Sequence, residues 1–151
     1  MLERTFPALE VPVALVMPRA EGGSTVAAYA EFDRAGAEPR GYDDLCSALE
    51  EGDVSSAAAH LHNNLAPAAR ALCSEAGEVE AWLRRRPGVL AAQITGSGTC
   101  SFALCESAAA AEAACAEARR KGWRAWATKT GWLARESLLE YSPATGCGSA
   151  W

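Results

Sequence analysis

The chain has 151 residues, half of them hydrophobic and 22% charged, and its formal net charge is −5 at pH 7. This length suits one globular domain, and the balance of apolar and charged residues excludes an intrinsically disordered chain. The acidic balance excludes a typical nucleic-acid-binding domain, because phosphate backbones attract clustered Lys and Arg. No run approaches the roughly 20 apolar residues of a membrane-spanning helix, and residues 1–4 (MLER) do not resemble a signal peptide, so we expect a cytoplasmic protein without a membrane partner.

The first predicted element is a strand over Val11–Met17, a short apolar run bounded by prolines. A glycine-containing loop follows it. Ser24 or Thr25 can then cap a helix whose apolar side chains recur at helical spacing as far as Phe32. Residues 36–41 are predicted to connect this helix to the next element.

Apolar spacing predicts several further helices in the middle of the chain. They cover Tyr42–Glu51, Val54–His62, Leu65–Leu72 and Glu78–Arg86. The third of these either continues the second or begins anew at Pro67. The last one ends in Arg84, Arg85 and Arg86, whose charges complement the dipole at a helix C-terminus. An anion-binding patch is the alternative interpretation of these three arginines.

The pattern changes from helix to strand at Val89. The predicted elements from here are the strands Val89–Thr95 and Cys100–Cys105, the helix Ala108–Lys121 and the strand Trp123–Thr128. Ser107 can cap the alanine-rich helix, and Gly122 ends it. Alanine gives this helix a high intrinsic propensity and a thin face that can pack closely on a sheet.

The order of these elements predicts an α+β fold. A strand, several helices, two strands, a helix and a strand indicate a ferredoxin-like domain, with a mainly antiparallel sheet, helices on one face and a helical insertion. We assign residues 1–130 to this domain and residues 131–151 to a C-terminal extension. Within the extension, Leu133–Tyr141 is a candidate helix and residues 142–149 are expected to be flexible.

The strongest local candidate for a binding site is the loop of Gly96, Ser97, Gly98 and Thr99 between two predicted strands. Two glycines bracketing a serine allow backbone N–H groups to approach a bound anion, so the loop can cradle a phosphate. An ordinary turn has the same composition, and the spacing alone does not separate the two interpretations.

Other polar residues form no recognisable catalytic set. His60 and His62 stand two apart, which places them on different faces of a helix and excludes a metal pair at i and i+4. Asn63 and Asn64 suit turn or helix-end hydrogen bonds. The six cysteines form no Cys-x-x-Cys pair and are expected to be reduced thiols in the core, so no metal site is predicted. They are Cys46, Cys73, Cys100, Cys105, Cys115 and Cys147.

Several segments together resemble the GHMP kinase superfamily. The third conserved motif and closing helix of that superfamily match Gly88–Leu104 (GVLAAQITGSGTCSFAL), Ala109–Ala113 and Gly122-Trp123. Four other segments resemble the branch that phosphorylates the 2-hydroxyl of 4-diphosphocytidyl-2-C-methyl-D-erythritol. They are Ala14–Pro18 (ALVMP), Gly23–Tyr29 (GSTVAAY), Leu61–Ala69 (LHNNLAPAA) and Trp126–Thr130 (WATKT). One departure is Asn64, where the branch usually has aspartate.

The resemblance implies a kinase that uses ATP and Mg²⁺ in the non-mevalonate route to isoprenoids, with this chain as its C-terminal domain. It places Gly96, Ser97, Gly98 and Thr99 near the transferred phosphate as backbone donors. It places Ser24 and Thr25 at the substrate end.

The residues of the family that act on the acceptor hydroxyl and grip ATP belong to its first half and have no counterpart in these 151 residues. We therefore expect no catalytic residue, no metal and no bound ATP in this chain, and no kinase activity from it alone. An apolar surface left by the missing N-terminal half is expected to cause dimerisation or aggregation. The alternative function is a stand-alone ferredoxin-like binding or regulatory module without catalysis.

Overall fold

The computed structural model describes residues 9–36 and 38–131. Within them, four strands form one antiparallel sheet in the order β2-β3-β1-β4. The strands are β1 (Pro12–Met17), β2 (Val89–Ile94), β3 (Ser101–Cys105) and β4 (Arg124–Lys129). The first strand therefore lies in the middle of the sheet, between two strands that follow it by more than 80 residues. The predicted α+β class with an antiparallel sheet is confirmed.

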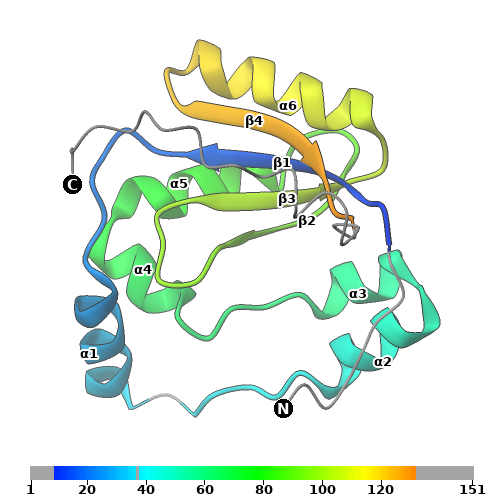
Figure 1. Cartoon of the computed structure of the whole chain (residues 1–151). Coiled ribbons are helices and arrows are strands. Elements are labelled where there is room, and N and C mark those ends of the chain that lie inside the picture. Colours follow the sequence, from blue (N-terminus) through cyan, green and yellow to red (C-terminus); the bar gives the residue numbers. More distant parts are fainter. Residues whose placement is uncertain (1–8, 37, 132–151) are drawn as a thin grey trace, which may run out of the picture.

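The helices fall into two groups around the sheet. They are α1 (Thr25–Ala35), α2 (Asp43–Glu51), α3 (Val54–His60), α4 (Ala66–Leu72), α5 (Ser74–Leu83) and α6 (Ala108–Arg120). Helices α5 and α6 cover one face of the sheet, whereas α1 with α4 and α2 with α3 form two flanking pairs (Figure 1). The flanking pairs belong to the helical insertion between β1 and β2. No helix in the described ranges combines the length and the apolar character needed to cross a lipid bilayer.

Small side chains let the two covering helices lie close to the sheet. Ala14 of β1, Ala103 of β3 and Ala118 of α6 have no exposed surface, and they share one core cluster with the fully buried Leu83 of α5. Close packing of this kind leaves little room for a larger side chain. Of the predicted core cysteines, Cys105 and Cys115 are buried in this cluster, and Cys73 is buried in a second cluster with Ala69 and Ile94.

The predicted helix caps at Ser24 and Ser107 are confirmed. Each serine hydroxyl accepts a hydrogen bond from the backbone amide three residues later, which satisfies one of the orphan donors of the first turn. Gly36 and Gly52 end α1 and α2 in the left-handed conformation.

Helix boundaries differ from the prediction at several places. Helix α3 ends at His60, so α4 is a separate helix. Helix α5 begins at Ser74, four residues before the predicted start, because Gly77 is tolerated inside it: a Cβ there would lie 3.3 Å from Cγ of Arg70. The absence of a side chain at this position leaves room for the arginine stem.

The predicted role of Arg84, Arg85 and Arg86 as the last helical turn needs correction, since α5 ends at Leu83. Specific partners hold two of the three side chains. Arg84 pairs with Glu80, and Arg86 pairs with Glu117 and lies over the Trp82 ring. The candidate helix Leu133–Tyr141 and the expected flexible segment 142–149 lie outside the described residues.

Truncation of the core should lower stability sharply. We expect Leu83→Ala to reduce the free energy of unfolding by about 2–5 kcal/mol, because it removes a fully buried side chain from a closely packed core. Val26→Ala is the matched control, since Val26 is 80% exposed on α1, and it should change stability by less than about 0.5 kcal/mol. Urea unfolding followed by circular dichroism measures both values, and equal losses would contradict this assignment of the core.

Candidate functional site

The loop between β2 and β3 is a tight turn with glycines in the left-handed region. Gly96 has a φ of 46° and Gly98 a φ of 92°. The Thr95 amide donates to the Cys100 carbonyl at 2.8 Å, and the Gly98 amide donates to the Thr95 carbonyl at 2.8 Å. Gly98 therefore supplies a conformation rather than a donor, because its own N–H is occupied inside the turn.

The other backbone amides of the loop are differently placed. Among the residues that the structure describes, no hydrogen bond uses the amides of Gly96, Ser97 or Thr99. The first of these residues is exposed and the other two are partly exposed. Two adjacent backbone donors, at Gly96 and Ser97, and a third at Thr99 are therefore available to a ligand, which is the chemistry of an anion-binding loop.

The fold brings the loop to the beginning of α1. The Thr25 and Ser97 hydroxyl oxygens are 3.1 Å apart, although 72 residues separate them in the sequence. Ser24 lies next to this contact, but its hydroxyl is occupied as the cap of α1. Of the two serine and threonine residues predicted at the substrate end, Thr25 thus has its side chain at the loop.

Close packing holds the loop against its neighbours. A Cβ on Gly22 would lie 2.2 Å from Cγ2 of Thr99, so that glycine is required for the segment before α1 to touch the loop. A Cβ on Gly98 would lie 3.1 Å from Cβ of Ala69 in α4. The loop therefore lies between the entry to α1 and the body of α4.

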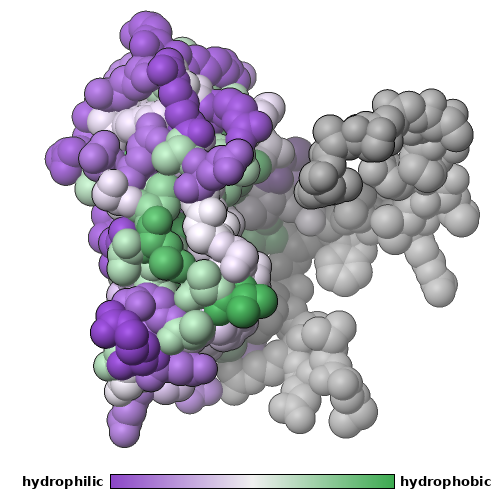
Figure 2. Space-filling view, turned by 90° about the vertical axis from the view of Figure 1, so that its left-hand side faces the viewer, coloured by the Kyte–Doolittle hydropathy of each residue, from purple (hydrophilic) through white to green (hydrophobic). Residues whose placement is uncertain are grey.

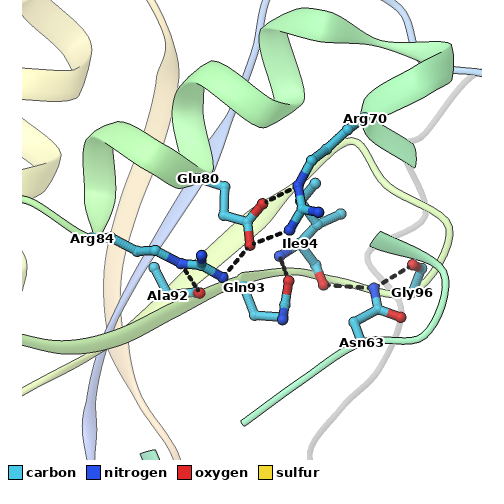
Figure 3. A network of polar contacts seen from close by, with 8 residues as sticks. All are labelled: Asn63, Arg70, Glu80, Arg84, Ala92, Gln93, Ile94 and Gly96. Atoms are coloured by element: carbon cyan, nitrogen blue, oxygen red, sulfur yellow. Dashed lines mark hydrogen bonds and ion pairs between the residues drawn. The ribbon is translucent and has the colours of Figure 1, made fainter. Parts of the chain in front are cut away.

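Asn63 grips the loop from the turn between α3 and α4. Its Nδ2 donates to the Ile94 carbonyl at 2.9 Å and to the Gly96 carbonyl at 2.7 Å (Figure 3). Its Oδ1 accepts from the Leu65 amide at 2.9 Å. The sequence predicted the hydrogen bond within the turn, and the structure bears it out. The two bonds to the distant strand end were not predicted, because nothing in the local sequence indicates a partner 31 or 33 residues away.

A buried carboxylate anchors the elements around the loop, and sequence reasoning missed it. Glu80 of α5 is 2% exposed and receives hydrogen bonds from Arg70 of α4 and from Arg84 (Figure 3). Arg84 also donates to the Ala92 carbonyl of β2 at 3.1 Å. Buried carboxylates require such charged donors, since an unpaired charge in the interior is costly. The only local signal was the spacing of four residues between Glu80 and Arg84, which is typical of a helical ion pair.

A second carboxylate fixes the segment that leads into α1. Glu75 accepts from the Ala20 amide at 2.7 Å and from the Trp123 indole at 2.8 Å. The Ala20 amide, with a smaller contribution from the indole, lowers the pKa of Glu75 below its usual value. Glu75 thus connects the start of α5 to the segment before α1 and to the segment between α6 and β4.

The contacts of the loop fit a phosphoryl group and do not fit a metal ion. Its neighbours Thr25 and Asn63 offer a hydroxyl and an amide, whereas Mg²⁺ in proteins is bound through carboxylates. The described part of the chain contains no group of three or more His, Cys, Asp or Glu residues that could hold a metal. His60 lies 3.9 Å from an Asp44 carboxylate oxygen, and His62 stacks on Tyr42.

Comparison with known families and proteins identifies the relatives of this chain. Residues 45–124 match the family model described as GHMP kinases C terminal. A 4-diphosphocytidyl-2-C-methyl-D-erythritol kinase of Cutibacterium acnes is 43% identical over 94 residues, which are 60% of this chain and 30% of that protein. The enzyme of the same name from Thermobifida fusca is 44% identical over 108 residues, which are 68% of this chain and 34% of that protein. The chain thus spans about a third of the length of these relatives.

Solved structures show the same fold at lower sequence identity. A crystal structure of 4-(cytidine 5'-diphospho)-2C-methyl-D-erythritol kinase superposes with a TM-score of 0.66 at 24% identity, covering 86% of this chain and 46% of that one. Homoserine kinase from Cytophaga hutchinsonii superposes with a TM-score of 0.60 at 20% identity, covering 83% of this chain and 42% of that one. The resemblance that the sequence motifs indicated is confirmed.

Glu75 should make stability depend on pH in the acid range. Its pKa is lower in the folded chain than the usual 4.5, so its contribution is complete above that value and is lost as the pH falls through the folded pKa. We expect Glu75→Gln to lower the melting temperature at pH 7, and the gap to the wild type to narrow at pH 3. The exposed Glu78 is the control, and Glu78→Gln should show no such gap. Thermal unfolding followed by circular dichroism tests this, and a gap that is constant with pH would contradict it.

Proposed function

Because this chain belongs to the family of GHMP kinase C-terminal domains, we propose that it is the C-terminal half of an ATP-dependent kinase that phosphorylates the 2-hydroxyl of 4-diphosphocytidyl-2-C-methyl-D-erythritol. The observation that carries the proposal is the meeting of Ser97 and Thr25 beside three unoccupied backbone amides. Relatives that are 43% and 44% identical and carry the name of this kinase support the choice of substrate.

The proposed role of the loop is to hold the transferred phosphoryl group. Phosphoryl transfer depends on positioning and on stabilising the charge of the equatorial oxygens, and backbone amides provide both without reorganising. The Gly96, Ser97 and Thr99 amides supply this part of the reaction. ATP and Mg²⁺ supply the phosphoryl donor and its counter-charge when they are bound.

The remaining parts of the reaction are assigned to the portion of the kinase that this chain does not span. No carboxylate or cationic side chain contacts the loop in the described ranges, so the loop lacks a base, a metal ligand and a nucleotide clamp. We therefore propose that the chain alone has no kinase activity and that the N-terminal half of the kinase is its partner.

An exposed apolar surface lies beside the loop and suits such a partner. Figure 2 shows apolar residues gathered in the middle of the face that forms the left side of Figure 1, where α1 and α4 lie. Val26 and Tyr29 of α1 are 80% and 54% exposed, and Leu72 of α4 is 39% exposed. Exposed apolar patches of this kind mark interaction surfaces. We propose that the N-terminal half of the kinase covers this surface, and that a second copy of the chain does so in its absence.

Activity should depend on joining the two halves. Incubated with ATP, Mg²⁺ and 4-diphosphocytidyl-2-C-methyl-D-erythritol, the 151-residue chain is expected to give no turnover. Mixing or fusing it with the first two thirds of the Cutibacterium acnes relative is expected to restore phosphorylation of the methylerythritol hydroxyl. A coupled assay for ADP measures the rate, and phosphorus NMR identifies the phosphorylated position.

Substitutions at two glycines with positive φ distinguish an effect on the loop from a general loss of stability. Gly98→Ala should reduce the restored rate at least about tenfold, because φ is 92° and the added Cβ meets Ala69. Gly36→Ala has a similar φ of 62° but open space around it, so it should alter stability and leave the rate within about twofold. If the chain fused with the first two thirds of the Cutibacterium acnes relative folds but shows no activity, the kinase proposal is refuted and the binding or regulatory module is favoured.

The apolar surface predicts self-association of the isolated chain. Light scattering at rising concentration should show a dimer or larger species, and Val26→Ser with Tyr29→Ser should shift the mixture toward monomer. Val54→Ser is a control, since Val54 lies on α3 in the other flanking pair. A wild-type chain that stays monomeric at high concentration would contradict this part of the proposal.

A further inference from the structure

We propose that Asn63 is a positioning residue that aims the backbone amide of Ser97 at the phosphoryl group. The identity of the anion rests on the proposed function above, but the orientation of the amide rests on hydrogen bonds alone. The residue stands outside the loop, in the turn between α3 and α4, and it touches the loop only through backbone carbonyl groups.

The side chain of Asn63 is held firmly enough to act as a fixed clamp. Both of its N–H groups donate, to the Ile94 and Gly96 carbonyls, and its Oδ1 accepts from the Leu65 amide. An amide side chain with two donated bonds and one accepted bond cannot rotate without losing at least one of them. The turn thus fixes the carboxamide, and the carboxamide fixes the end of β2.

Because the peptide group is planar, the hydrogen bond from Asn63 to the Gly96 carbonyl also fixes the direction of the Ser97 N–H. The carbonyl of Gly96 and the N–H of Ser97 belong to one trans peptide, so they point in opposite directions. Holding the carbonyl 2.7 Å from Asn63 therefore turns the Ser97 N–H away from Asn63. A ligand on that opposite side meets a donor whose direction is already set.

Packing does not hold this part of the loop. Gly96 is exposed, and a Cβ built on it would meet no atom within 4 Å. The Gly98 amide and the Ser97 hydroxyl are tied to Thr95 and Thr25, but neither bond restrains the Gly96 carbonyl. Loss of the Asn63 amide would therefore free the peptide between Gly96 and Ser97 to rotate.

The neighbouring residue offers a matched control. Asn64 has the same side chain and clamps a different backbone segment: its Oδ1 accepts from the Arg40 amide at 3.0 Å and its Nδ2 donates to the Arg40 carbonyl at 3.1 Å. Replacing either asparagine by alanine removes backbone hydrogen bonds without changing charge. Only Asn63→Ala removes a bond to the loop.

Backbone NMR of the isotope-labelled full chain tests the proposal, with inorganic phosphate as the probe. In the wild type, phosphate should shift the Ser97 amide resonance. Asn63→Ala should weaken the phosphate affinity about tenfold, which is of the order of one hydrogen bond to a charged ligand. It should also lower the NMR order parameter of the Ser97 amide, because the peptide is then free to rotate. Asn64→Ala should leave the affinity within about twofold and the order parameter unchanged, although both variants lower the melting temperature.

The outcomes separate this inference from the proposed function. If Asn63→Ala leaves both the order parameter of the Ser97 amide and the phosphate affinity unchanged, the positioning role is overturned. Equal effects of the two alanine variants on Ser97 would overturn it as well, since they would reflect general destabilisation. If the wild-type loop does not respond to phosphate, the anion role in the proposed function fails. A lower order parameter at Ser97 in Asn63→Ala, without such a change in Asn64→Ala, still supports the positioning role.

Discussion

The arrangement of the site depends on one buried ion cluster, the Glu80 carboxylate with Arg70 and Arg84. The carboxylate is 2% exposed, and its two arginines reach it from α4 and from the end of α5. Arg84 also donates to the Ala92 carbonyl, so the cluster ties α4 and α5 to the edge strand β2. Removing one member would leave a buried charge without a partner. The stability lost in this way is larger than the net stability that the intact ion pair contributes. The position of α4, and with it the wall against which the loop packs, follows from this cluster.

The loop of residues 96–99 is restrained from three directions by elements that are distant in the sequence. Thr25 contacts it from α1, Asn63 from the turn after α3, and Ala69 from α4. The amides of Gly96, Ser97 and Thr99 keep no hydrogen-bond partner within the described residues, instead of pairing in the sheet. The chain thus contributes shape and fixed dipoles to the proposed reaction. In the proposal, charge, nucleotide and metal are assigned to the portion of the kinase that the chain does not span. No carboxylate or cationic side chain donates to or accepts from the loop in the described residues, which is the physical reason for proposing that activity requires both parts.

Local patterns located most elements, and they failed where a tertiary contact decided a boundary. Serine caps at Ser24 and Ser107 and the change from helical to alternating spacing near Val89 are local signals, so the elements that depend on them were predicted well. The predicted start of α5 came after Gly77, which lies inside the helix although glycine is unfavourable in a helix interior. Its position against Arg70, and hence the earlier start of α5, depends on an ion pair with Glu80 that no local pattern contains.

The sequence by itself determined the fold class, the family and the loop with two glycines, because hydrophobic spacing, caps and motif order are properties of short segments. Only the tertiary structure decided which groups meet at that loop. The side chain that contacts it is Thr25 rather than Ser24, Asn63 donates to its backbone, and the Gly98 amide is unavailable to a ligand because it donates within the turn. Contacts across 33 and 72 residues arise from the packing of helices on a shared core. That packing minimises the free energy of the whole chain, so no segment of the sequence specifies these contacts alone.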